Sequence, residues 1–276
     1  MSSLKELSPD ASEVMRQNVM KDEFGWDIPV ELIPLPTRGV IYSPDSTLYK
    51  SETLQIKSMT AREEDILASP AFHKDGSTLT HLIQSCLIDK NINCEDLILG
   101  DRMALMVGIR VTGYGPEYNA SAKCQSCNQK NDFTVDLTGL KIKRLKLQPV
   151  EEGTNQFLFS LPVTKKKIVF KYITAREERE RNISIKNMQR IMGTSISNNI
   201  TSFLENAIIS IDGVTDRMKI KHFVMNMPAF DSKALRRFIL DNEPGVDMTC
   251  HYECSNCGFH NESAMPMTSE FFWPST

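Results

Sequence analysis

The hexapeptide Met59-Thr-Ala-Arg-Glu-Glu64 occurs twice in this chain, the second time as Ile173-Thr-Ala-Arg-Glu-Glu178. A threonine followed three residues later by a glutamate can form a capping box. In it the hydroxyl accepts from an early helix N–H, and the glutamate reaches back to the threonine N–H. Each copy follows strand-like alternation and, further upstream, a Leu-Pro pair. Each copy therefore predicts the start of a helix after a strand.

A longer similarity lies downstream, where residues 101–127 align without a gap on residues 231–257. Both segments begin with an aspartate, Asp101 or Asp231, that we expect to N-cap a helix, and both end in a C-x-x-C pair. The order of Leu-Pro, capping box, Asp-initiated helix and C-x-x-C thus occurs twice, with length differences in the connecting segments. This order predicts an α+β protein of two tandem similar halves, an internal duplication in which each half holds strands, helices and a zinc-knuckle hairpin.

The repeats divide the chain into five parts. We expect an N-terminal arm over residues 1–26, a first repeat over 27–139, a linker over 140–149, a second repeat over 150–268 and an aromatic tail over 269–276. Within the arm, residues 8–22 have the apolar spacing of an amphipathic helix. The linker alternates apolar and basic residues, as a half-exposed strand does.

The C-terminal tail carries three adjacent aromatic residues, Phe271, Phe272 and Trp273. Aromatic side chains are enriched among the anchors of protein interfaces. We therefore predict that these three residues bind a partner protein. The alternative is that they fold back and close the core of the second half.

The C-x-x-C pairs are Cys124-Gln-Ser-Cys127 and Cys254-Ser-Asn-Cys257, and both have hairpin-like flanks. Two cysteines three residues apart on a tight turn can direct both sulfurs at one ion, and two such pairs complete a tetrahedral zinc site like that of a zinc ribbon. The first pair has no further cysteine or histidine close by in the sequence. We predict one structural Zn²⁺ per chain, shared by the two halves and held by all four cysteines. Metal-free thiols and a redox-active C-x-x-C pair are the two alternatives.

Composition excludes several classes of protein. The chain has 276 residues, enough for about two domains. Its 35 acidic and 32 basic residues give a net charge of −3, which argues against general nucleic-acid binding. No apolar stretch is long enough for a membrane span, and the N-terminus is too charged for a secretory signal. The sequence also lacks a Gly-rich phosphate loop, a nucleophile elbow and a pair of acidic residues at a catalytic spacing. A zinc ion bound by four thiolates has no open coordination position for water or substrate. We therefore expect no enzyme activity.

The chain also resembles a known family. The runs Leu35-Pro-Thr-Arg-Gly-Val-Ile-Tyr42 and Ile56-Lys-Ser-Met-Thr-Ala-Arg-Glu-Glu-Asp-Ile-Leu67, with the aromatic end, are similar to the baseplate-hub protein family of T-even-type contractile-tailed bacteriophages. The matching positions are Leu35, Pro36, Gly39, Tyr42, Met59, Thr60, Ala61, Arg62, Glu63 and Glu64. The resemblance implies a structural or assembly component of the tail baseplate, without catalysis of its own. Such a protein is made in the host cytoplasm, is located in the virion and binds other tail proteins, with no small-molecule substrate and no membrane.

Two other functions remain open at this point. A zinc-ribbon nucleic-acid-binding or transcription accessory factor is favoured by a run of basic residues, Lys141, Lys143, Arg144 and Lys146, with residues 165–167 nearby. It is disfavoured by the net charge and by the lack of aromatic platforms between those residues. An enzyme with a structural zinc and an unrecognised active site is the third function.

Overall fold

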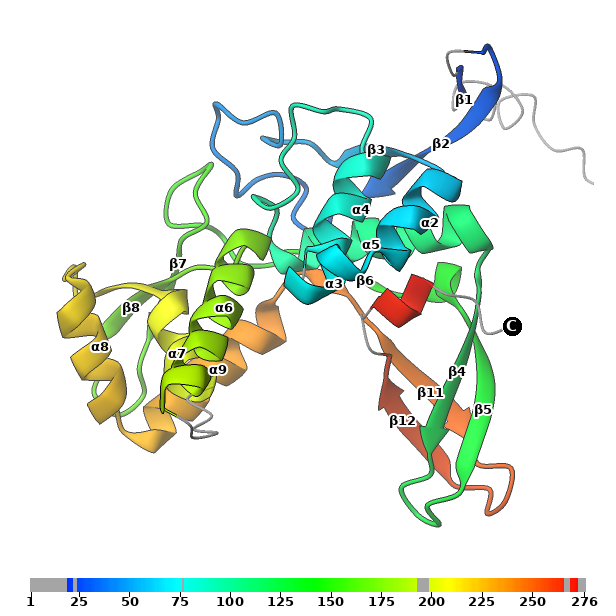
Figure 1. Ribbon diagram of the computed structural model, residues 1–276. Coiled ribbons are helices and arrows are strands. Elements are labelled where there is room, and N and C mark those ends of the chain that lie inside the picture. Colours follow the sequence, from blue (N-terminus) through cyan, green and yellow to red (C-terminus); the bar gives the residue numbers. More distant parts are fainter. Residues whose placement is uncertain (1–18, 22–23, 76, 193–198, 266–268, 273–276) are drawn as a thin grey trace, which may run out of the picture.

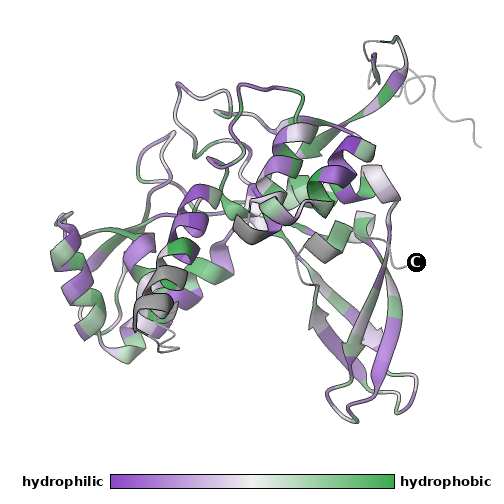
Figure 2. Cartoon of the chain, in the orientation of Figure 1, coloured by the Kyte–Doolittle hydropathy of each residue, from purple (hydrophilic) through white to green (hydrophobic). Residues whose placement is uncertain are grey.

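The computed structural model describes residues 19–21, 24–75, 77–192, 199–265 and 269–272. It is a mixed structure of helices and strands. Figure 1 shows two bodies joined near their centres and a pair of β-hairpins that project from one of them. Figure 2 shows apolar residues concentrated around the long helix of the first body, whereas much of the hairpin surface is hydrophilic.

The first body is built on an antiparallel sheet with the strand order β1-β2-β3. Its elements are β1 (Val19–Lys21), β2 (Asp27–Pro34), β3 (Thr53–Lys57), α2 (Ala61–Ala68), α3 (Pro70–Asp75), α4 (Thr78–Cys86) and α5 (Leu99–Tyr114). Helix α5 packs on β2 and β3, and Leu87 forms an isolated antiparallel bridge with Ile56 of β3. The prediction of a helix over residues 8–22 is wrong at residues 19–21, because these residues form β1, a strand paired with β2. Residues 8–18 of that prediction lie outside the described residues.

The second body has a similar order of elements. Its antiparallel sheet has the order β7-β8-β9. The elements are β7 (Phe157–Ser160), β8 (Lys167–Phe170), α6 (Ala175–Met192), α7 (Asn199–Ala207), β9 (Ile208–Ile211), α8 (Arg217–Asn226) and α9 (Ala229–Asn242). In the second body, β9 follows α6 and α7 in the sequence and pairs with β8. The corresponding segment of the first body, after α4, forms the isolated bridge between Leu87 and Ile56.

Two hairpins carry the C-x-x-C pairs. They consist of β4 (Glu117–Lys123) with β5 (Lys130–Asp136), and of β11 (Thr249–Glu253) with β12 (His260–Ala264). The hairpins lie side by side (Figure 1). The rings of Phe133 and Tyr252 stack between them, with centroids 4.3 Å apart and an interplanar angle of 9°. An aromatic stack of this kind stabilises the packing beyond the area that it buries.

The predicted linker is bonded to both bodies. It is a strand only at β6 (Ile142–Lys143), which pairs with β10 (Gly245–Val246) of the second half. The backbone N–H of Leu145 donates to the carbonyl of Pro36 at 3.0 Å, in the first body. Close backbone approach at this junction requires a glycine, because a Cβ on Gly100 would lie 1.8 Å from the carbonyl oxygen of Pro244.

Both predicted capping boxes are confirmed. The Glu63 carboxylate accepts from the backbone N–H of Thr60 at 2.9 Å, and α2 begins at the next residue. In the second copy, Glu177 accepts from the N–H of Thr174 at 3.1 Å, and the N–H of Glu177 donates to the Thr174 hydroxyl at 3.3 Å. The repeated hexapeptide therefore starts a helix in both bodies, as its local chemistry predicts.

The predicted N-caps at Asp101 and Asp231 are wrong. The N-cap residues are Ile98 and Pro228, and each aspartate lies inside the first helical turn with an exposed fraction of 0%. A buried carboxylate needs hydrogen-bond donors, and these come from loops that are distant in the sequence. Asp101 accepts from the backbone N–H and hydroxyl of Thr37, after the first Leu-Pro, and Asp231 accepts from the same two groups of Thr164, after the second.

The C-terminal aromatic residues lie inside the chain's own core. Phe271 and Phe272, in the 3₁₀ turn η2 (Ser269–Phe272), both have an exposed fraction of 0%. The Phe271 ring lies 5.1 Å from the ring of Tyr118 in β4, and its carbonyl accepts from the Arg110 Nε of α5 at 3.2 Å. Neither ring is exposed in this position, and the 3₁₀ turn contacts α5 of the first body. Trp273 lies outside the described residues.

This position of the tail predicts a stability effect. We expect Phe272→Ala to lower the free energy of unfolding by about 3–5 kcal/mol, because it leaves a cavity in a filled core. Phe230→Ala is the matched control, since that side chain is 65% exposed, and it should change stability by less than about 0.5 kcal/mol. Urea unfolding followed by circular dichroism measures both. Equal effects of the two substitutions would contradict the assignment of the tail to the core.

Glu63 predicts a pH dependence. It is fully buried and accepts from the Lys57 Nζ at 2.8 Å and from the Ser85 hydroxyl at 2.5 Å. Burial acts to raise the pKa of Glu63, but the hydrogen bonds from Lys57, Ser85 and Thr60 outweigh it and lower the pKa from its ordinary 4.5 to about 2. A pKa that is lower in the folded state stabilises the fold above the ordinary value, and this stabilisation is lost as the pH falls through the folded value.

We therefore expect wild-type protein to be more stable than Glu63→Gln near neutral pH, with the difference shrinking as the pH falls from 4.5 towards 2. Urea unfolding at a series of pH values measures this difference. Glu31→Gln, at an exposed position of β2, is the control. A difference that stays constant across this range would show that the Glu63 charge does not stabilise the fold.

Candidate metal centre

Each C-x-x-C pair occupies the turn of a two-stranded hairpin, 124–127 between β4 and β5 and 254–257 between β11 and β12. In both turns the backbone N–H four residues after the first cysteine donates to that cysteine's carbonyl at 2.9 Å. The donating residues, Asn128 and Gly258, have φ angles of 58° and 68°. This left-handed conformation suits glycine and asparagine and reverses the chain so that both sulfurs of a pair face the same side.

The structure brings all four predicted cysteines together. The Sγ atoms of Cys124, Cys127, Cys254 and Cys257 all lie within 4.8 Å of one another. Across the hairpins, the sulfur atoms are 3.7 Å apart for Cys124 and Cys257 and 3.6 Å apart for Cys127 and Cys254. A tetrahedral zinc with Zn–S bonds of about 2.3 Å has sulfur–sulfur edges of about 3.8 Å, whereas a disulfide is about 2.05 Å long. The set could therefore hold a zinc ion.

Burial divides the four sulfurs into an inner and an outer pair. Cys124 and Cys254 are buried, Cys127 is half-buried and Cys257 is exposed. Burial acts to raise the pKa of Cys124, but the N–H groups of Cys127 and Ser126 outweigh it, with help from the Asn261 amide, and lower the pKa to about 6. The Phe259 N–H acts to lower the pKa of Cys257, but the neighbouring sulfurs outweigh it and raise the pKa to about 12. Four thiolates this close repel one another, and a divalent cation would remove that repulsion.

A buried asparagine from each hairpin contacts the cysteine turn of the other. The Asn261 Oδ1 accepts from the backbone N–H of Gln125 at 2.9 Å, and its Nδ2 donates to the Cys124 Sγ at 3.5 Å. The Asn131 amide makes the same two contacts in the opposite direction, to the N–H of Ser255 and to the Cys254 sulfur.

The contacts of these two asparagines with the cysteine turns were not predicted from the sequence. A signal for them was present, because the gapless alignment of residues 101–127 with 231–257 continues to the identical pair Asn131 and Asn261. An asparagine in a turn usually serves its own backbone. Its reach across to another hairpin depends on tertiary packing.

Three of the seven basic residues that favoured nucleic-acid binding have side-chain partners within the chain. The Lys143 Nζ lies 3.4 Å from an Asp247 carboxylate oxygen, and Arg144 donates to the Leu35 carbonyl at 2.6 Å. Lys166 pairs with Asp212 at 2.7 Å.

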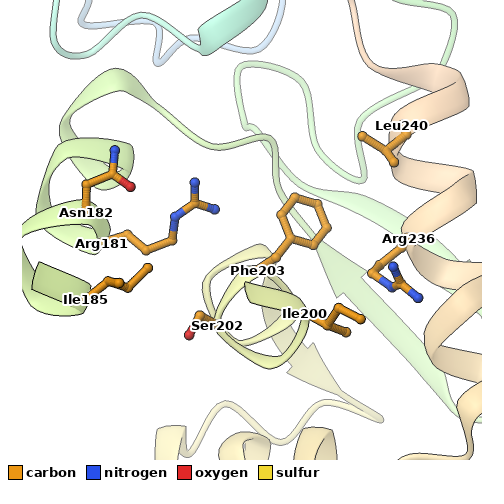
Figure 3. A pocket seen from close by; sticks show the side chains of 8 residues that line it. All are labelled: Arg181, Asn182, Ile185, Ile200, Ser202, Phe203, Arg236 and Leu240. Carbon is orange, nitrogen blue, oxygen red and sulfur yellow. The ribbon is translucent and has the colours of Figure 1, made fainter. Parts of the chain in front are cut away.

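Two hollows are found among the residues that the structure describes. One cavity of about 510 Å³ lies between α6, α7 and α9 (Figure 3), where Phe203 separates Arg181 from the α9 residues. A second hollow of about 760 Å³ is lined by residues of β1, β2, β3, α2, α3 and α4 and of the segment that follows α4. No Asp, Glu or Cys side chain lines either one. Within the part of the chain that the structure describes, no helix is long and apolar enough to cross a bilayer.

Comparison with known proteins gives one match. The model of a family described as "T4 bacteriophage base plate protein" matches residues 42–273, which include the second body, both cysteine hairpins and the first body from β3 onward. No curated protein and no solved structure matches the chain.

Proposed function

The chain belongs to the T4 bacteriophage base plate protein family, and on this basis we propose that it is a structural and assembly component of the tail baseplate, in the hub region. It is made in the host cytoplasm, becomes part of the virion tail, and acts by contacts with neighbouring tail proteins. The observation that carries this proposal is the extent of the family match, which runs from residue 42 to residue 273.

The proposed function includes one structural Zn²⁺ per chain. Cys124, Cys127, Cys254 and Cys257 would hold it, and their mutual distances support this assignment. A site of four thiolates has no open position for water or substrate, so the ion would stabilise the fold and leave no place for metal-assisted catalysis. A redox role is disfavoured, because a thioredoxin-like pair begins a helix and both pairs here lie in turns between strands.

We also propose that the two halves, 27–139 and 150–268, arose by duplication. Three kinds of contact support this history, each present once per half. They are the capping box, the aspartate bonded to the loop after Leu-Pro, and the cysteine turn with its left-handed residue. The nucleic-acid function gains no comparable support, and three of the seven basic residues that suggested it have partners within the chain.

Metal analysis of the purified full chain tests the zinc site, and we expect about one zinc per chain. Cys124→Ser and Cys254→Ser, one from each hairpin, should each abolish stoichiometric zinc, because all four sulfurs belong to one coordination shell. Cys86→Ser is the matched control, since Cys86 is buried in α4 outside the cluster. Zinc that persists in one hairpin after the other is mutated, or two zinc ions per wild-type chain, would contradict a shared site.

Assembly tests the baseplate role. A phage that lacks this protein should form sedimenting baseplates when supplied with wild-type or Cys86→Ser protein, with the chain incorporated in them. Cys124→Ser should reduce incorporation at least tenfold, because the hairpin pair loses its cross-link. Baseplates that form normally without the chain would contradict the structural role.

A further inference from the structure

We propose that Asn131 and Asn261 are reciprocal positioning residues of the metal centre, which align the two cysteine turns so that the four sulfurs converge. This inference rests on the proposed zinc site and adds to it two residues that hold the ligands without touching the ion. Each asparagine belongs to one hairpin and acts on the first cysteine of the other.

The first observation is that both amides are buried and fully bonded. Asn131 is 5% exposed and Asn261 is 3% exposed. One N–H of each amide donates within its own turn, from Asn131 to the Gln129 carbonyl at 2.8 Å and from Asn261 to the Phe259 carbonyl at 2.9 Å. This local bond fixes the side-chain rotamer, so that the second N–H and the carbonyl oxygen face the opposite hairpin.

The second observation is that the other contacts of each amide fall on two adjacent residues of the opposite hairpin. Asn131 accepts from the N–H of Ser255 at 2.9 Å and donates to the Cys254 Sγ at 3.5 Å. Only a turn that presents this backbone N–H beside a sulfur satisfies the amide completely. Because an unsatisfied buried amide costs about 1–3 kcal/mol, the pair of asparagines favours a single alignment of the hairpins.

The residue type fits this role. Asparagine provides one acceptor and two donors on a short side chain. An aspartate could accept from the Ser255 or Gln125 N–H, but it would place a negative charge beside a thiolate and could not donate to it. A glutamine would carry the amide one methylene too far for the turn bond and the cross-hairpin bonds to form together.

The two amides also explain the division of the sulfurs. They donate to Cys124 and Cys254, which are the buried pair. The outer sulfurs, of Cys127 and Cys257, receive no bond from either of these amides among the contacts that the structure describes. The asparagines thus hold the inner pair of sulfurs, and the outer pair, Cys127 and Cys257, would complete the coordination shell.

Zinc affinity of full-chain variants tests the proposal, by competition with a chromophoric chelator. Asn131→Asp and Asn261→Asp keep the size and the acceptor but lose the donor to sulfur. Each should bind zinc about 10–100-fold more weakly, the usual effect of removing a partner of a metal ligand. Asn131→Ala, which loses both contacts, should weaken binding at least as much. Asn119→Ala is the matched control, because Asn119 is an exposed residue of β4 whose Oδ1 accepts from Thr134 in its own hairpin.

The free energy of unfolding of the zinc-free proteins distinguishes a residue that positions the ligands from one that only stabilises the fold. We expect Asn131→Asp to lower the free energy of zinc binding by more than it lowers the free energy of unfolding of the zinc-free protein. Its cadmium-loaded form should also show a shifted sulfur-to-metal charge-transfer band. Wild-type protein with one zinc, together with unchanged zinc affinity in both Asn→Asp variants, would overturn this inference and leave the zinc site standing. Equal weakening by Asn119→Ala would also overturn it. A wild-type chain that binds no zinc would overturn the zinc site and this inference together.

Discussion

The packing of the β4–β5 hairpin against the β11–β12 hairpin is the constraint on which the rest of the structure depends. The sulfurs of Cys127 and Cys254 lie 3.6 Å apart although 127 positions separate them in the chain. The chain between these two cysteines must therefore fold so that the second hairpin packs against the first. The β6–β10 pair and the close approach of Gly100 to Pro244 make that return possible. A bond that closes so long a loop removes much conformational entropy from the unfolded chain, so a shared zinc ion would stabilise the whole protein and not only the hairpins.

The same constraint connects the structure to its proposed place in a phage tail. A protein made in a reducing cytosol cannot rely on disulfides to join distant segments. A site of four thiolates and one zinc ion can form under those conditions, and it has no open coordination position for water or substrate. Such a site would give the proposed assembly component a fixed shape before it binds its partners. The aromatic tail contributes to that shape, because Phe271 and Phe272 fill the core beside Arg110 and Tyr118.

The features that sequence reasoning could predict are those whose chemistry is local. Thr60 and Glu63 are three residues apart, so their capping box follows from spacing alone. The C-x-x-C spacing likewise indicates two sulfurs directed from one turn, whereas the site shared by the two turns was predicted from the repeat. Asp101 has the sequence appearance of an N-cap, but its partner Thr37 is 64 positions away and only the fold reveals it. The strand at 19–21 depends on pairing with β2, and Asn131 acts on a turn of the other half. In each of these cases tertiary contacts overrule or complete a local pattern.

Zinc K-edge X-ray absorption of the purified full chain tests the central claim most directly, because it reports the ligands of the bound ion without any substitution. We expect a first shell of four sulfur atoms at about 2.3 Å, with no nitrogen or oxygen ligand. A first shell that contains nitrogen or oxygen would mean that the two hairpins do not share a four-cysteine site. A purified chain without bound zinc would contradict the account altogether.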